Sequence, residues 1–100
     1  MLTSKQRAQL RGLANKLPDT LQIGKDGLTE GLARQLDELL ECHELVKVKV
    51  LENSLLTPRS ASEELCAQLR AEPVQCIGAK FVVYRQSSDK DKRKIVLEKA

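Results

Sequence analysis

A short apolar segment that runs into a glycine-bracketed turn and then into a helix constrains this chain more than any other feature. Residues 21–23 are followed by Gly24-Lys25-Asp26-Gly27, and a periodic helical pattern begins at about Thr29. Glycine lets backbone N–H groups approach an anion because it has no Cβ. The first turn of a helix adds unpaired N–H groups and a partial positive charge. With the charge of Lys25, the pattern predicts a phosphate-sized site between a strand and a helix.

The first helix is predicted over residues 4–17, where apolar residues recur at the spacing of one helix face. Thr3 or Ser4 can cap its start, and Pro18 is expected to end it. Arg7 and Arg11 are expected on one side of its apolar stripe, and Lys5 and Lys16 further round, beside the small residues Ala8 and Gly12. They form a candidate nucleic-acid face or an ordinary solvated one, and they are Lys5, Arg7, Arg11 and Lys16.

Two more helices follow. The second is predicted over residues 29–43 with Thr29 as its N-cap, and its polar side carries acidic residues. The third is predicted over about residues 61–71, where Ser60 or Ser62 supplies the cap and Pro73 the stop. Because of its acidic side, the second helix is not expected to face nucleic acid.

Four segments have the composition of strands. In residues 44–51, three valines alternate with Lys47 and Lys49, so one sheet face is expected to be partly solvated and positively charged. Residues 20–23 form a shorter strand, and residues 74–77 and 81–84 form a hairpin joined by Gly78-Ala79-Lys80. Residues 95–97 either add an edge strand or dock on the domain.

This order predicts an α/β fold, a compact helix-strand-helix-strand-helix-strand-strand sandwich with a mixed four-stranded sheet. The strand–helix–strand connections are long enough to be parallel and right-handed. At 100 residues the chain is expected to form one domain over residues 1–86, followed by a basic, flexible C-terminal segment over 87–100. Neither a membrane span nor a signal peptide is recognisable, which favours the cytoplasm.

Charge is distributed unevenly along the chain. Residues 1–27 carry five Lys or Arg against two Asp, and residues 73–100 carry seven bases against three acids. Residues 28–72 are acidic, with nine acids against five bases. If the two basic ends meet in space they form a positive face suited to a phosphate backbone. If they do not meet, they are two solvated ends.

Groups that would support catalysis are scarce. His43 is the one histidine, at the end of the second predicted helix, where it is expected to act as a cap. Cys42, Cys66 and Cys76 form no C-x-x-C pair and read as buried or half-buried free thiols. The glycine turn has neither Walker nor dinucleotide-binding spacing. We therefore expect no enzyme, no metal, no cofactor and no small-molecule substrate.

A Gly-x-x-Gly turn alone is weak evidence, but KH modules use such a loop to clamp a nucleotide backbone. Phe81 and Tyr84, the two aromatic residues, are three apart on a strand and point to opposite faces. Base stacking of the RRM kind is therefore not expected, and recognition of phosphates and shape fits better.

The chain resembles the bacterial YhbY family, the stand-alone form of the CRM (chloroplast RNA splicing and ribosome maturation) domain. The resemblance covers about residues 4–97. Four parts in order carry it, namely Lys5-Gln6 with Leu10-Arg11-Gly12-Leu13-Ala14, Ile23-Gly24-Lys25-Asp26-Gly27-Leu28-Thr29, His43-Glu44-Leu45-Val46-Lys47-Val48-Lys49-Val50, and Ile77-Gly78 with Phe81-Val82-Val83-Tyr84-Arg85.

The resemblance implies a fold similar to the C-terminal domain of translation initiation factor 3. It also implies RNA binding, with 23S ribosomal RNA in precursors of the large ribosomal subunit as the partner. The family's loop falls on Gly24, Lys25, Asp26 and Gly27, and its basic helix on Lys5 and Arg11. Arg7 and Lys16 join this candidate site by helical geometry alone. A monomer that binds RNA and no membrane is expected. The alternatives are a module that binds an acidic ribosomal or assembly protein, and a small nucleotide-binding enzyme.

Overall fold

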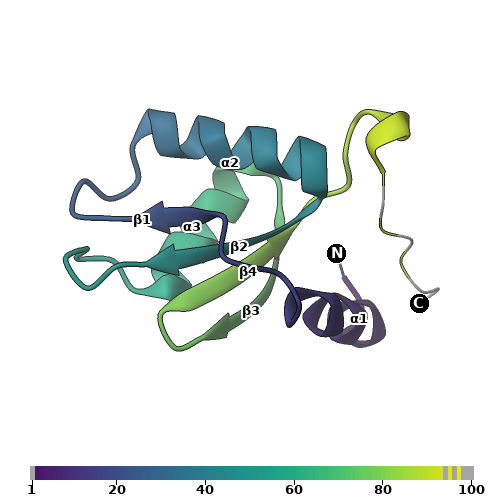
Figure 1. Cartoon of the computed structure of the whole chain (residues 1–100), viewed down its shortest axis with the longest axis horizontal. Helices are drawn as coiled ribbons and strands as arrows, with labels where there is room; N and C mark the ends of the chain where they lie inside the picture. The colour runs from purple at the N-terminus through teal and green to yellow at the C-terminus, as the bar shows by residue number, and fades with distance from the viewer. Residues whose placement is uncertain (1, 94, 96, 98–100) are drawn as a thin grey trace.

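The protein consists of a four-stranded sheet with helices on both of its faces (Figure 1). The computed structural model describes residues 2–93, 95 and 97. The predicted order of three helices and four strands is confirmed, and a short 3-10 helix follows it. The elements are α1 (Ser4–Ala14), β1 (Leu21–Ile23), α2 (Glu30–His43), β2 (Leu45–Val50), α3 (Pro58–Leu69), β3 (Glu72–Ile77), β4 (Lys80–Tyr84) and η1 (Lys90–Lys92).

The sheet is mixed, and its strand order is β1-β2-β4-β3. β1 pairs in parallel with β2, and α2 makes the crossover between them. β4 is antiparallel both to β2 and to β3, so β2 and β3 run in the same direction with β4 inserted between them. The sequence predicted the parallel and antiparallel connections, but it did not place β4 in the centre of the sheet.

The larger core lies between the sheet and the pair α2 and α3. Val46, Val48 and Val50 point into it from β2, as their alternation predicted, and Phe81 joins them from β4 with no exposed surface. α2 contributes a stripe of leucines at helical spacing, of which Leu36 is fully buried.

A smaller core lies on the opposite face, under α1. Leu10 and Ala14 of α1 pack on Leu45, Val82 and Tyr84 of the sheet. The partly buried side chains that close this core come from both ends of the chain, and they are Leu2, Leu17, Ile95 and Leu97. The basic N-terminal helix and the basic C-terminal segment therefore meet in space, as one of the two charge hypotheses required.

The end of α1 and the start of α3 differ from prediction. α1 ends at Ala14 rather than at residue 17, with Asn15 as its C-cap, and the chain leaves the helix well before Pro18. α3 begins at Pro58, three residues earlier than predicted. Proline suits this first helical position because the N–H that it lacks would have no partner in the helix. Thr57 is the N-cap, and its side chain and that of Ser60 each accept the backbone N–H of the other residue, which forms a capping box.

The stop of α3 and the start of β2 also differ from prediction. α3 ends because Arg70 adopts a left-handed conformation with φ 57°, while Pro73 lies inside β3. Proline is tolerated there because β3 is an edge strand with an irregular register beside it. Glu44 is not part of β2. It is the C-cap of α2 at φ 65°, and its side chain is fully buried.

The C-terminal segment is attached to the end of α2 in its described part. The carboxylate of Glu44 accepts the N–H of Ser87 at 2.9 Å and that of Ile95 at 3.1 Å. Ile95 and Leu97 therefore dock, whereas positions 94 and 96 of the hypothetical last strand lie outside the described residues. The boundary at residue 86 and the flexibility of 87–100 stay predictions. Among the described residues, no helix has the length and apolar character to cross a membrane.

Candidate nucleic-acid interface

The Gly24–Gly27 segment forms a tight turn that connects β1 to α2. The N–H of Gly27 donates to the carbonyl oxygen of Gly24 at 3.1 Å, and Gly27 has φ +68°, a conformation that favours glycine. Lys25 and Asp26 are exposed at its tip. The Gly27 amide is thus used by the turn itself, so it is not a donor for an anion as the sequence pattern suggested.

Gly24 has a different reason for lacking a side chain. It has no positive φ, and a Cβ added there would lie 3.8 Å from Leu51 Cδ1 and 3.9 Å from Asn53 Oδ1, which are ordinary contact distances. The fold therefore does not require glycine at this position. A backbone that another molecule approaches closely would require it.

The start of α2 lies directly beside the turn. Thr29 caps the helix, and its hydroxyl accepts the N–H of Leu32 at 3.1 Å. A hollow of about 540 Å³ extends from Gly24 over the first turns of α2 to Arg34. Arg34 is exposed, and sequence reasoning missed it because the acidic residues of α2 dominated its polar side.

The four basic residues predicted for this region differ in burial. Lys5 and Arg11 of α1 and Lys16, which follows α1, are exposed. Arg7 is half-buried against the edge strand β3, where it lines a hollow with Gln75 and Cys76, and its Nε is buried without a hydrogen-bond partner. The four residues were predicted to act together, and Arg7 differs from the other three because its side chain is half-buried.

α1 covers only part of its sheet face. One row of cross-strand neighbours stays uncovered, and we call it the open row. It consists of Gln22, Lys49, Lys80 and Ile77. Ile77 is 60% exposed at the far edge. Gln22 is two residues before Gly24, so the open row leads from β3 across the sheet to the glycine turn.

Lys49 and Lys80 are direct cross-strand partners, an arrangement in which like charges repel. Asp19 relieves that repulsion, since its Oδ1 lies 3.0 Å from Lys80 Nζ. The hydrogen bond from Lys80 lowers the pKa of Asp19, and the charge of Lys49 contributes to the same shift. The alternation in residues 44–51 predicted that Lys49 lies on a charged sheet face, but it did not predict that Lys49 pairs with Lys80 across the strands.

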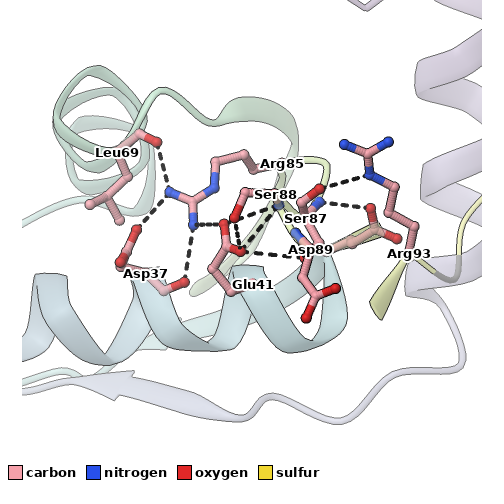
Figure 2. A network of polar contacts seen from close by, with 9 residues as sticks. Asp37, Glu41, Leu69, Arg85, Ser87, Ser88, Asp89 and Arg93 are labelled. Atoms are coloured by element: carbon pink, nitrogen blue, oxygen red, sulfur yellow. Dashed lines mark hydrogen bonds and ion pairs between the residues drawn. The ribbon is translucent and has the colours of Figure 1, made fainter. Parts of the chain in front are cut away.

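Arg85 belongs to a structural network instead (Figure 2). Its guanidinium donates to Asp37, Glu41 and the carbonyl oxygen of Leu69, and only 17% of its side chain is exposed. Glu41 also accepts from the hydroxyl of Ser88 at 2.6 Å, and that bond is the main cause of its lowered pKa. The network binds β4, α2 and α3 together, and both Nη1 and Nη2 of Arg85 donate within it.

The remaining reactive groups are scattered. The three cysteines are free, but Cys42 and Cys76 are exposed rather than buried or half-buried as predicted. Only Cys66 is buried, which raises its pKa to about 11. In the described part of the chain, no cluster of three or more His, Cys, Asp or Glu side chains could hold a metal ion.

Comparisons with known proteins agree with this architecture. A family model described as the CRS1 / YhbY (CRM) domain matches residues 2–85. The chain is similar to "Probable RNA-binding protein YqeI" of Bacillus subtilis, with 38% identity over 89% of this chain and 93% of that one. It is also similar to "Probable RNA-binding protein PA4753" of Pseudomonas aeruginosa, with 37% identity over 91% and 88% of the two chains.

A solved structure gives the same result for the fold. The solution structure of the hypothetical protein SAV1595 from Staphylococcus aureus is 40% identical in sequence and superposes with a TM-score of 0.77, covering 96% of this chain and all of that one. The matched residues include the glycine turn, α1 and the whole sheet. The chain therefore belongs to the CRS1/YhbY (CRM) domain family.

Proposed function

We propose that this protein binds RNA without catalysis, and that its partner is 23S ribosomal RNA in precursors of the large ribosomal subunit. The names of relatives that are 36–38% identical to this chain describe RNA binding. The observation that supports the proposal most directly is the turn before α2. Gly24 has no side chain there although the fold could accommodate a Cβ, which leaves its backbone accessible to a phosphate. The ribosomal partner rests on the family resemblance.

The mechanism is the capture of a phosphate beside the turn. The Leu32 N–H is already donated to Thr29, so the candidate donors are the amides of Glu30 and Gly31, which precede it in the first helical turn. Lys25 supplies a full charge at the tip, and Arg34 supplies another on the far side of the hollow. Asp26 also lines the hollow and reduces its net positive charge.

The phosphate track continues along α1 and the open row. Lys5, Arg11 and Lys16 are exposed and free to contact a backbone, while Arg7 makes the smallest contribution because it is turned toward β3. Each phosphate that such a residue neutralises adds close to one unit to the slope of log affinity against log salt concentration. Phe81 and Tyr84 are buried, so neither can serve as a stacking platform, and the track recognises the charge and shape of the backbone.

The test is a charge reversal at the tip of the turn. Lys25→Glu should weaken binding to 23S fragments of different sequence by a similar factor and leave the melting temperature unchanged, because Lys25 is exposed. Arg59→Glu is the matched control, since Arg59 is also exposed but lies on α3. Unchanged affinity and salt slope for Lys25→Glu would refute the phosphate site.

The ribosomal partner needs a second experiment. Ultraviolet crosslinking in growing cells, with sequencing of the attached RNA, should give reads at a few 23S sites with precursor ends enriched. Reads spread over messenger and transfer RNA would refute the ribosomal partner and retain RNA binding. A complex that survives RNase treatment, with no attached RNA, would instead support the alternative of an acidic protein partner.

A further inference from the structure

An apolar groove lies where the end of α1 meets the start of β2, next to the open row. Its volume is about 520 Å³, within the ~300–1,000 Å³ of small-ligand sites. Leu13, Leu17 and Pro18 form its apolar wall, and 42% of Leu13 is exposed. These three apolar side chains line one groove together with polar residues, and a contiguous apolar surface with a polar rim is typical of a binding site.

The rim of the groove carries positive charge. Lys16 and Lys47 are the charged side chains that line it, and no acidic side chain lines it among the described residues. Lys47 lies two residues before Lys49 on the same face of β2, about 7 Å along the strand. The groove is therefore continuous with the open row. Its positive rim suits a negatively charged polymer rather than an uncharged or basic partner.

His43 gives the groove a flat ring. It is the last residue of α2, its side chain is exposed, and it lines the same groove as Leu13 of α1 and Leu17, which follows α1. Histidine is one of the side chains on which unstacked RNA bases stack. Because Phe81 and Tyr84 are buried, His43 is the ring that this protein can offer to a base.

We propose that the groove holds one unpaired nucleobase of the bound RNA, stacked on His43 and packed against Leu13 and Leu17. Lys16 and Lys47 then contact the phosphates on either side of that nucleotide. This inference rests on the proposed RNA binding and adds a preference to it. A phosphate track alone would not distinguish a paired stem from a stem with a bulged base, whereas an occupied groove would.

The experiment compares two RNA hairpins that share one stem and differ by a single bulged 2-aminopurine. The full-length protein should bind the bulged hairpin more tightly and change the 2-aminopurine fluorescence. His43→Ala should lower affinity for the bulged hairpin by about 5- to 150-fold, the range found when a stacking side chain is removed, and leave the paired hairpin unaffected. His43→Phe should retain the preference, because it keeps a flat ring.

A second pair of variants separates the groove from general apolar surface. Leu13→Gln should reduce the preference for the bulge, while Leu55→Gln, at a fully exposed position in the loop between β2 and α3, should not. Equal binding of both hairpins by the wild type, or a preference that survives His43→Ala, would overturn the base site and leave RNA binding intact. Binding of neither hairpin would overturn the RNA-binding proposal itself.

Discussion

The guanidinium of Arg85 donates hydrogen bonds to both the side chain and the main chain of Asp37. Its Nη1 lies 2.7 Å from the carboxylate Oδ1, and its Nη2 lies 3.1 Å from the carbonyl oxygen of the same residue. The guanidinium also reaches the Leu69 carbonyl oxygen at 3.0 Å, so one side chain at the end of β4 connects α2 to α3 (Figure 2). A planar fork with five donors suits this position, whereas an ammonium group does not.

Arg85→Lys should therefore destabilise the protein by about 1–3 kcal/mol, because carbonyl and carboxylate oxygens lose their donors. Urea unfolding measures the change. Arg59→Lys is the control, since the exposed Arg59–Glu63 pair should contribute less than about 1 kcal/mol. A variant that unfolds like the wild type but loses RNA affinity would place Arg85 in the interface instead.

The two glycines of the turn should respond differently to alanine. Gly27→Ala should cost about 1–2 kcal/mol of stability, because φ +68° is unfavourable for a residue with a Cβ. Gly24→Ala should change stability by less than about 0.5 kcal/mol, because the new Cβ meets only ordinary contacts. If a phosphate approaches the backbone there, the same variant should still weaken RNA binding.

Thermal unfolding and filter binding on the two variants decide this. If Gly24→Ala keeps both the stability and the RNA affinity of the wild type, a phosphate does not contact the backbone at residue 24. Gly27→Ala should lose affinity only in proportion to its loss of folded protein.

Asp19 should moderate the charge of the open row. Its bond to Lys80 holds its pKa below the usual 3.8, so the stability that the pair contributes is complete above about pH 4 and is lost as the pH falls through the folded-state pKa. Asp19→Asn should therefore be less stable than the wild type at neutral pH, and the difference should shrink in acid. Urea titrations at several pH values measure it.

The same variant tests whether the open row binds RNA. Removing a negative charge beside Lys49 and Lys80 should strengthen RNA binding at low salt and steepen the salt dependence. Unchanged affinity would exclude the open row from the interface.

The fold was predictable where one period dominated a segment. Alternating valines specified β2 and its buried face, and the leucine stripe specified α2, because burying an apolar face decides the secondary structure locally. Boundaries were less predictable because several residues can cap a helix. Thr57 competes with Ser60 and Ser62 as the cap of α3, and only the position of Pro58 favours the earlier start.

The candidate site was predictable only in its local part. The turn from Gly24 to Gly27 follows from glycine chemistry within four residues. The separation of Arg7 from Lys16 does not, because it depends on where α1 crosses a sheet whose strand order the sequence left undetermined. For the same reason the proximity of Lys16 to Lys47 and His43 could not be read from their spacing along the chain.

Gly12 offers a test in which stability and affinity should move in opposite directions. It lies in the interior of α1 with nothing within 4 Å of an added Cβ, so Gly12→Ala should stabilise the protein by about 0.5–1 kcal/mol through helix propensity. RNA binding should nevertheless weaken if the backbone between the exposed Arg11 and Lys16 lies against a phosphate.

Ala67→Gly, in the exposed middle of α3, should lower the free energy of unfolding by a similar amount and leave RNA affinity unchanged. Calorimetry and filter binding on both variants thus separate the two effects, because reduced folding cannot explain weaker binding by a more stable protein. Wild-type affinity in Gly12→Ala would mean that only the long side chains of α1 reach the RNA.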